Sequence, residues 1–320
     1  VRPVTTTADH PYAGALDAYP MGTTLTPGDD EWRTRMSASK IAAVVGGSPY
    51  ESRFSLWHKM AGLLPWDDGQ DADEKARGHY IEPALRQWWR DAHPDVDVVR
   101  TRSWVHAERH WQIATPDGLV CRRDKGRTPI GLMECKTSAL DWEWGDEGSD
   151  QVPLGYRYQA QWSMDTLGLP VCHFSGLSSR LLCRRYEVEN DADVAEWRRE
   201  ENEIFLASSA SCQRPSVDEH AETYRAVRAL HPLIDDADVI IPTDLAHRYA
   251  QAQRDVAAAG AAKQAAVTEI ADRLGSARRA VTEDDVLVAY RKPVANSTPC
   301  LAPAPGLTKR FIPTESQEAS

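Results

Sequence analysis

The 320-residue sequence contains no long hydrophobic run and no closely paired cysteines. Because no stretch of about 18 apolar residues is present, we expect no membrane-spanning helix. The start of the chain has no basic segment followed by an apolar one, so we expect no secretion signal. The six cysteines are scattered without a Cys-x-x-Cys motif, which argues against zinc and iron–sulfur sites. These absences predict a soluble cytoplasmic protein with reduced cysteines.

An excess of positive charge is also missing, since the formal net charge is −11. Such an acidic chain is not expected to bind nucleic acid indiscriminately. The charges are uneven, however, because acidic residues cluster over 67–74 whereas basic residues gather over 33–59 and 122–127. The composition therefore excludes broad adhesion to nucleic acid but is compatible with a local basic groove.

Hydrophobic periodicity predicts a chain that mixes helices and strands. Helical spacing covers 37–45, 56–60, 73–92, 156–167 and 194–205, and strand-like runs cover 96–105, 112–114, 119–122, 130–136, 171–177 and 181–188. Pro83 lies inside the third helical stretch, so we expect a kink or a break there. This order predicts an α/β fold in which helices flank a central mixed sheet.

Composition divides the chain into four expected parts. Residues 1–30 form a loose N-terminal arm, 31–215 the α/β core, 216–294 a C-terminal helical extension, and 295–320 a disordered tail. The extension includes an Ala-rich stretch over 242–274 with an amphipathic stripe at helical spacing. We interpret this stripe as a surface for an antiparallel helix or a partner rather than as a cofactor site.

The side chains most suited to chemistry lie on two strand-like runs that flank a loop over 124–129. This loop contains charge, Gly and Pro, which is typical of a hairpin. Pairing of the two runs places Asp117 close to the triplet Glu134-Cys135-Lys136. The period of two along a strand then puts Glu134 and Lys136 on one face and Cys135 on the other.

This arrangement favours metal-dependent phosphodiester chemistry. Clustered carboxylates repel one another unless a proton or a cation lies between them. Hard oxygen ligands suit Mg²⁺ or Mn²⁺, which also bind phosphates. A lysine beside the metal could orient or deprotonate a water molecule. Taken alone, however, a Glu-x-Lys pattern is more often an ion pair on an exposed strand.

Pro116-Asp117 together with Glu134-Cys135-Lys136 resembles the signature of the PD-(D/E)XK nucleases. Four stretches in the same order resemble, more specifically, the YqaJ-like viral recombinases, which are relatives of phage lambda exonuclease. These stretches are Arg35–Ile41, Arg77–Glu82, Asp117–Lys136 and Tyr158–Met164. The resemblance implies a restriction-endonuclease-like PD-(D/E)XK core over residues 31–215.

The resemblance also implies a function. It is that of a Mg²⁺-dependent 5′-to-3′ exonuclease that acts on double-stranded DNA ends and leaves 3′ single strands for phage-type homologous recombination. A single-strand annealing protein is the implied partner, and a homo-oligomer is implied by analogy with the ring trimer of lambda exonuclease. The implied location is the cytoplasm of a bacterial host that carries the phage or prophage.

The residues at the site of such an enzyme can be assigned by the same resemblance. Glu82, Asp117, Glu134 and the main-chain carbonyl of Cys135 would bind two Mg²⁺ or Mn²⁺ ions, with Lys136 and Gln159 completing the catalytic set. Two ions can stabilise both the attacking and the leaving oxygen of a phosphodiester. By residue type alone, Glu82 is more typical of a solvated helical glutamate and Gln159 of an ordinary surface residue.

A second set of residues matches the family segment that holds DNA phosphate. It consists of Arg33, Arg35, Ser37, Ser39 and His58. Arginine and the N–H groups at a helix N-terminus both suit phosphate, and the 5′-terminal phosphate is the expected ligand. Either Arg33 or Arg35 could be the arginine that binds this phosphate. The alternatives are a solvated helix cap with surface arginines, and a histidine that only packs.

Two other functions remain open on the sequence. One is a different PD-(D/E)XK nuclease, such as a restriction-like endonuclease, and the other is a catalytically silent DNA-binding protein on the same fold. The silent protein is disfavoured because Asp117, Glu134 and Lys136 are all present. A comparison of linear with covalently closed circular DNA separates the exonuclease from the endonuclease.

Overall fold

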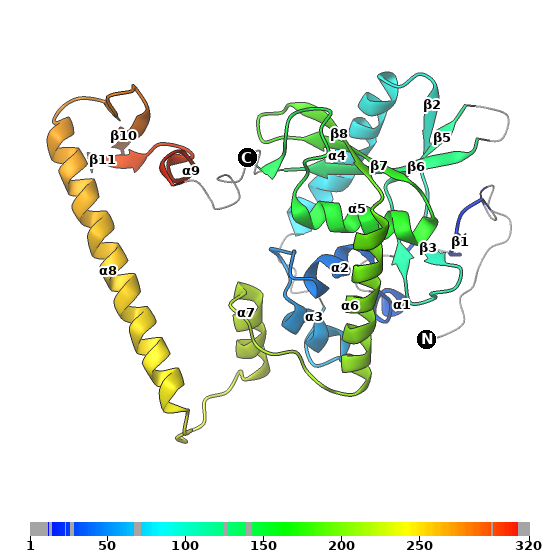
Figure 1. Cartoon of the computed structure of the whole chain (residues 1–320), viewed down its shortest axis with the longest axis horizontal. Helices are drawn as coiled ribbons and strands as arrows, with labels where there is room; N and C mark the ends of the chain where they lie inside the picture. Colours follow the sequence, from blue (N-terminus) through cyan, green and yellow to red (C-terminus); the bar gives the residue numbers. More distant parts are fainter. Residues whose placement is uncertain are drawn as a thin grey trace. The chain divides into compact units, whose positions relative to one another are not determined.

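The structure is a computed structural model that forms two compact units, Val1–Ile234 and Asp235–Ser320 (Figure 1). It describes residues 12, 15–22, 24–25, 29–66, 72–123, 127–138, 143–295 and 297–312. Large parts of the expected N-terminal arm, and the end of the expected tail from residue 313, lie outside the described residues. No helix in the described part of the chain is long and apolar enough to cross a membrane.

The first unit is organised around a five-stranded sheet. In spatial order its strands are β2 (Val96–Val99), β5 (Gly118–Arg122), β6 (Pro129–Thr137), β7 (Val171–Leu177) and β8 (Cys183–Glu189). β6 and β7 are parallel and the other neighbours are antiparallel. A parallel pair needs a crossover connection, which α5 (Leu154–Leu167) provides.

Helices cover both faces of this sheet. α4 (Ala72–Asp91) contacts β2, β6 and β7, and α5 contacts β6, β7 and β8 (Figure 1). Met133 packs with Trp89 of α4, whereas its neighbour Leu132 packs with Met164 of α5, as alternation along a strand requires. The predicted α/β class with a central mixed sheet flanked by helices is therefore confirmed.

Three shorter helices precede α4. They are α1 (Asp30–Arg33), α2 (Ala38–Val44) and α3 (Arg53–Met60). α3 begins with a capping box in which Ser52 and Ser55 each satisfy the other's backbone N–H. α4 continues through Pro83, so the expected break is wrong and the alternative, a kink, stays a prediction.

The strand expected over 96–105 is divided between two sheets. Its first part is β2, and its last part is β3 (Trp104–His106), which pairs with β1 (Ala18–Pro20) and β4 (Ile113–Ala114). A local pattern does not predict this division, because β3 pairs with β1, which lies far away in the stretch that was expected to be a loose arm. Hydrogen bonding to β3 orders that part of the arm.

The first unit continues beyond the expected end of the core at residue 215. After α6 (Ala192–Ala210), α7 (Ala221–Leu230) packs on α3. Thr223 and Ser52 are hydrogen-bonded through their hydroxyl oxygens at 2.8 Å, and Ala226 packs with Phe54. α7 is therefore held by the core rather than by the extension that follows it.

The second unit combines one long helix with a small sheet. α8 spans Thr243–Leu274, and the sheet has the order β11-β10-β9, followed by α9 (Leu307–Phe311). The strands are β9 (Arg279–Val281), β10 (Leu287–Val294) and β11 (Ser297–Pro303). The structure thus differs from the expected disordered tail, because antiparallel pairing with β10 makes residues 297–303 a strand.

Candidate active site

The hairpin predicted from the sequence places Asp117 beside the Glu134-Cys135-Lys136 triplet. Asp117 immediately precedes β5, and Gly118 pairs with Met133 of β6. The Asp117 carboxylate accepts a hydrogen bond from the backbone N–H of Cys135, with 2.7 Å between Oδ2 and N. A hydrogen bond therefore joins the Pro-Asp part of the PD-(D/E)XK signature directly to its Glu-x-Lys part.

Glu134 and Lys136 lie on the α5 face of the sheet, as the period of two predicts. Lys136 Nζ donates to Glu134 Oε2 at 2.7 Å, and the Glu134 side chain is only 7% exposed. The same ammonium lies 5.4 Å from the ring centroid of Tyr156 on α5. Gln159 follows three residues later on this helix, so it shares the helix face of Tyr156. Cys135 packs on the opposite face, in the cluster around Trp89.

Arg86 connects the third predicted carboxylate to this group. Its Nη2 donates to Glu82 Oε1 and its Nη1 to the main-chain carbonyl of Asp117, both at 3.0 Å. The sequence analysis missed Arg86. The available signal was its position four residues after Glu82, where opposite charges on a helix face meet. Glu82, Asp117, Glu134 and Lys136 together are called the carboxylate site below.

Burial and mutual repulsion perturb the acids of the carboxylate site. Burial, together with Asp117, raises the pKa of Glu134 to about 7, although Lys136 opposes this shift. The pKa of Glu82 is likewise raised by burial and by Asp117. Burial lowers the pKa of Lys136, but Glu134 and Asp117 raise it more, so the pKa lies above its ordinary value and the ammonium is charged.

The donor set of the carboxylate site is suited to a hard divalent cation. In the described residues no three His, Cys, Asp or Glu side chains are grouped closely enough to hold a metal ion in this arrangement. Instead Arg86 and Lys136 supply the positive charge that contacts the acids. The pKa values of Glu82 and Glu134 remain raised mainly because these side chains are buried, and Asp117 adds to both shifts. Carboxylate oxygens in such a place fit Mg²⁺ or Mn²⁺.

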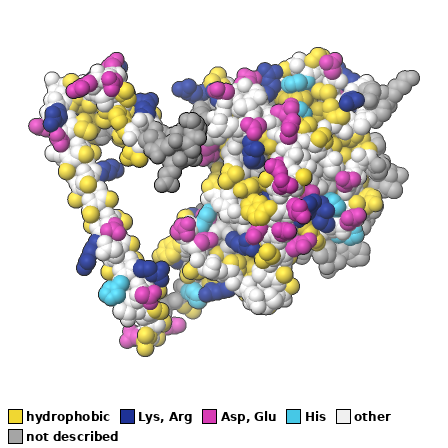
Figure 2. Space-filling view, in the orientation of Figure 1, with side chains coloured by type: hydrophobic (Ala, Val, Ile, Leu, Met, Phe, Trp, Pro, Cys, Tyr) yellow, Lys and Arg dark blue, Asp and Glu magenta, His cyan; other side chains and the backbone are white. Residues whose placement is uncertain are grey.

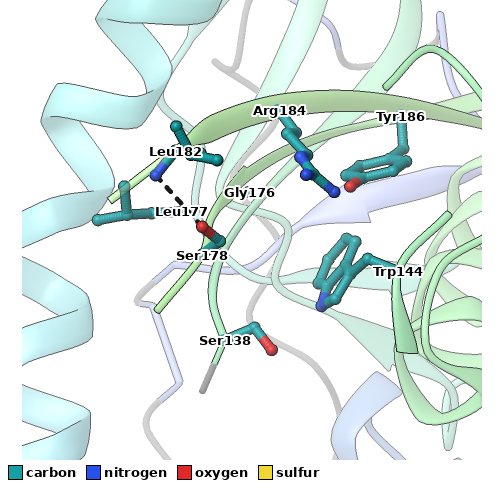
Figure 3. A pocket seen from close by; sticks show the side chains of 8 residues that line it. All are labelled: Ser138, Trp144, Gly176, Leu177, Ser178, Leu182, Arg184 and Tyr186. Atoms are coloured by element: carbon teal, nitrogen blue, oxygen red, sulfur yellow. Dashed lines mark hydrogen bonds between the residues drawn. The ribbon is translucent and has the colours of Figure 1, made fainter. Parts of the chain in front are cut away.

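A small pocket adjoins the carboxylate site at the ends of β6 and β7. Its lining is Ser138, Trp144, Gly176, Leu177, Ser178, Leu182, Arg184 and Tyr186 (Figure 3). Tyr156 links the two places, because its ring contacts Lys136 and lies 5.7 Å from the Trp144 ring. The indole N–H of Trp144 is buried and has no hydrogen-bond partner among the described residues. The pocket thus places a buried indole N–H and packed aromatic rings close to the residues around Lys136.

The predicted phosphate-binding residues are not brought together in the same way. Arg35 is 1% exposed, and its guanidinium donates to the main-chain carbonyl of His110 and to Glu31, the latter at 2.9 Å. His58 is also buried, and its Nδ1 is hydrogen-bonded to the carbonyl of Phe54 at 2.8 Å. In this arrangement both side chains hold the fold rather than face a ligand.

Of the remaining members of this set, Arg33 and Ser39 are exposed and Ser37 is buried. The Arg33 side chain is 45% exposed and pairs with Asp30 at 3.2 Å. Ser37 occupies the N-cap position of α2, but its hydroxyl is hydrogen-bonded to that of Ser39 instead of to the helix backbone. The segment Asp30–Lys40, called the arginine segment below, therefore contains one accessible arginine, Arg33, and one buried arginine, Arg35.

Lys40 explains why the arginine segment is rigidly packed. Its ammonium donates to the carbonyls of Trp32 and Arg35 at 2.6 and 2.7 Å. It also lies over the rings of Trp32 and Trp66. Burial lowers the pKa of Lys40 to about 7. These contacts of Lys40 therefore hold the end of α1 against the start of α2.

Comparison with known proteins assigns the part of the chain that carries these residues. Residues 31–170 match the family profile of the YqaJ-like viral recombinase domain. This part of the chain is a YqaJ-like viral recombinase domain. No curated protein sequence matches the chain.

Solved structures of an alkaline exonuclease are similar to the chain. The crystal structure of LHK-Exo in complex with dAMP is 22% identical, covers 57% of this chain and 93% of that one, and has a TM-score of 0.44. A second structure of LHK-Exo, from Laribacter hongkongensis, is 21% identical, covers 62% of this chain and 97% of that one, and has a TM-score of 0.41.

The matched YqaJ-like domain contains the whole carboxylate site, Gln159 and all of the arginine segment except Asp30. It ends before β7, so the pocket beside the site combines residues within the matched range with residues after it. α6, α7 and the second unit also lie outside the match. These parts are therefore features of this chain that the domain assignment does not describe.

Proposed function

We propose that this chain is a divalent-metal-dependent nuclease that degrades double-stranded DNA from its ends. The observation that carries the proposal is the convergence of Asp117, Glu134 and Lys136 on one hairpin of a YqaJ-like domain. Degradation runs 5′ to 3′ and leaves 3′ single strands for phage-type recombination, in which a single-strand annealing protein uses the product. This polarity and this partner follow from the family resemblance.

The carboxylates and the lysine have separate roles in this proposal. Glu82, Asp117, Glu134 and the carbonyl of Cys135 would hold Mg²⁺ or Mn²⁺, which stabilises negative charge that develops on the phosphodiester oxygens. Lys136, charged and fixed by Glu134, donates hydrogen bonds toward the reacting phosphate or its water. Gln159 shares the α5 helix face of Tyr156, which contacts Lys136, and we assign to it the positioning of the same group.

The lining of the pocket next to Lys136 contains side chains of the kinds that contact DNA. Trp144 and Tyr186 are aromatic, and Arg184 adds a positive charge to the same lining (Figure 3). Aromatic faces and arginine are the side chains on which the bases and backbone of single strands are held. Because Tyr186 is buried and the pocket encloses little space, we assign only the partly exposed Arg184 at its rim to contact with a DNA strand that passes the carboxylate site.

The test compares linear with covalently closed circular duplex DNA in Mg²⁺, with a chelator as the negative control. We expect the linear DNA to be degraded, the circle to survive, and all digestion to stop with chelator. A label at the 5′ end should be released before a label at the 3′ end. Cleavage of the circle would instead favour a restriction-like endonuclease, and digestion in chelator would contradict the metal-dependent mechanism.

A paired set of variants assigns the activity to the proposed site. Asp117→Asn removes a carboxylate that the hairpin holds, so cleavage should fall by about a thousand-fold, on the order of 4 kcal/mol. The matched control is Glu187→Gln on β8, whose side chain is 57% exposed. Equal loss in both variants would mean that the fold, rather than the site, had been disturbed.

A further inference from the structure

The central sheet and the smaller sheet of the first unit share one antiparallel register. The last pair of β2 and β5 is Val99–Leu119, and the first pair of β3 and β4 is Trp104–Ala114. The second pair lies five positions from the first on each strand, so the register continues through the break between the two sheets. The residues between these pairs therefore run alongside one another, although they belong to neither sheet.

This break brings Arg100 next to the carboxylate site. Its two sides are 100–103 and 115–118, so in the continued register Arg100 lies opposite Gly118. Gly118 directly follows Asp117, whose carboxylate is bonded to the backbone of β6. The break therefore sets an arginine beside the turn that carries the first acid of the site.

Arg100 also lies near the acid that α4 supplies. Burial and then Asp117 raise the pKa of Glu82, and the charges of Arg86 and Arg100 oppose this rise. Arg86 already donates to Glu82 and to the Asp117 carbonyl. Arg100, in contrast, is exposed, and within the part of the chain that the structure describes its guanidinium makes no hydrogen bond and no ion pair. Its donors remain available to an anion from outside the chain.

Neighbouring side chains fix the backbone from which Arg100 extends. Ser103 is fully buried, and its hydroxyl is hydrogen-bonded to that of Thr115 at 2.7 Å. Trp104 is also fully buried, and its indole N–H donates to the Thr101 hydroxyl at 2.7 Å. Because the backbone is already ordered, Arg100 would lose mainly side-chain freedom when it binds a ligand.

The charge of the molecule makes a single arginine at this place important. The net charge is −11, and the face of the first unit drawn in Figure 2 shows basic side chains scattered among acidic ones. Contacts with phosphate supply most of the affinity of a protein for DNA of any sequence. The acids of the carboxylate site repel phosphate unless a cation offsets them. An exposed arginine beside these acids is therefore well placed to attract a phosphate.

We propose that Arg100 binds a DNA phosphate next to the one that is positioned for cleavage. The ligand is supplied by the proposed function, on which this inference rests. Two phosphates flank the bond that is cut near an end, namely the 5′-terminal phosphate and the next internal one. Both offer the same oxyanion, to which an arginine can donate two parallel hydrogen bonds.

Binding of linear duplex DNA, followed by fluorescence anisotropy in Ca²⁺, tests the proposal under conditions where the proposed mechanism allows no turnover. Arg100→Ala should weaken binding about tenfold, as expected for one charge-assisted contact. It should also reduce the steepness of log affinity against log salt by roughly one. Arg100→Lys keeps the charge and should recover most of that steepness. Equal binding by Arg100→Ala and the unmodified chain overturns the proposal.

The matched control removes the same charge from another part of the first unit. Arg225 on α7 has a side chain that is 57% exposed and pairs with Glu222 at 3.1 Å. Arg225→Ala should leave both the affinity and its salt dependence unchanged. An equal loss in Arg225→Ala and Arg100→Ala would show a general effect of net charge and would contradict a specific contact at Arg100.

Two duplexes of the same sequence identify which phosphate Arg100 contacts. One carries a 5′-phosphate and the other a 5′-hydroxyl group. A contact with the terminal phosphate weakens binding of only the phosphorylated duplex when Arg100 is replaced by alanine. A contact with the internal phosphate weakens binding of both duplexes by the same factor.

A second background separates a DNA contact from a structural role at Glu82. Glu82→Gln removes the charge near Arg100 and keeps the shape of the side chain. If Arg100 contacts DNA, Arg100→Ala should weaken binding by a similar factor in this background. An effect that disappears there would mean that Arg100 acts only through Glu82, which contradicts the proposal. Thermal unfolding checks that each variant is folded.

These measurements also separate the role of Arg100 from the proposed function. A chain that binds DNA with the expected loss in Arg100→Ala but does not degrade DNA in Mg²⁺ overturns the proposed function and supports the contact. A chain that degrades DNA but binds it equally well without Arg100 overturns the contact alone.

Discussion

The carboxylate site and the arginine segment both bury charged side chains, but different groups hold those charges. At the carboxylate site, Glu82 and Glu134 keep raised pKa values although Arg86 and Lys136 contact them. In the arginine segment, the buried cations are held mainly by main-chain carbonyls. An added cation would therefore stabilise the charged acids of the first site, whereas the buried charges of the second hold helices together. Burial of charge alone does not identify a functional site.

The largest expected effect is on activity, at Glu134. Glu134→Gln removes the charge that a divalent cation needs while keeping the shape of the side chain, so cleavage should fall by about a thousand-fold or more. Lys136→Met should have an effect of similar size because it removes the donor beside the phosphate. The measurement is the initial rate on linear duplex DNA with Mg²⁺, with DNA binding followed separately. Retained cleavage in Glu134→Gln would remove this residue from the mechanism.

The hairpin at this site was predictable because its information is local. Alternating apolar residues, a loop with Gly and Pro, and a Pro-Asp-Gly turn specify two adjacent strands, and their pairing places Asp117 on Cys135. The assignment of Glu82 came instead from the family resemblance. Arg86, which joins Glu82 to the hairpin, spans 31 positions to reach the Asp117 carbonyl, and no strand period predicts that contact.

An intermediate loss of activity is expected from Arg86→Ala. The variant frees the Glu82 carboxylate and the Asp117 carbonyl from a shared donor, so the acids are less well positioned but remain present. We expect cleavage to slow by about ten- to a hundred-fold, consistent with a charge-assisted hydrogen bond of roughly 1.5–3 kcal/mol. Arg90→Ala is the control, because Arg90 lies one turn further on the same helix and pairs with Asp97. Equal rates for Arg86→Ala and the unmodified chain would show that Arg86 does not position the site.

A loss of stability rather than of activity is expected from Arg35→Ala. The guanidinium is buried against the His110 carbonyl and Glu31, so its removal leaves these acceptors without a donor. The free energy of unfolding should fall by about 3 kcal/mol, as for other broken buried charge contacts. Thermal unfolding measures this loss, and any surviving folded protein should still prefer the same DNA ends. If Arg35→Ala leaves the stability unchanged but removes the preference for these DNA ends, Arg35 binds phosphate instead.

The arginine segment shows why the sequence left Arg33 and Arg35 as competitors. They are two positions apart, and both belong to a basic, hydroxyl-bearing stretch that suits phosphate. What separates them is the contact of Arg35 with His110, 75 positions away. The division between β2 and β3 was missed for the same reason, since β3 pairs with β1 at the start of the chain. Contacts of this kind depend on the assembled fold and not on any local pattern.

The smallest expected effect belongs to Arg33, and it separates the two arginines directly. Arg33 is 45% exposed and pairs only with the exposed Asp30 among the described residues, so Arg33→Ala should change the free energy of unfolding by less than about 0.5 kcal/mol. If Arg33 contacts the 5′-terminal phosphate, the variant should degrade 5′-phosphorylated linear duplex up to about tenfold more slowly, within the range of a partly solvated Arg–phosphate contact. Its rate on 5′-hydroxyl duplex should not change. The ratio of these two initial rates is the measurement, because it cancels any general loss of active protein. If Arg33→Ala leaves this ratio unaltered, Arg33 is excluded as the phosphate ligand. The proposal for the carboxylate site would still stand, because Glu82, Glu134 and Lys136 take no part in that contact.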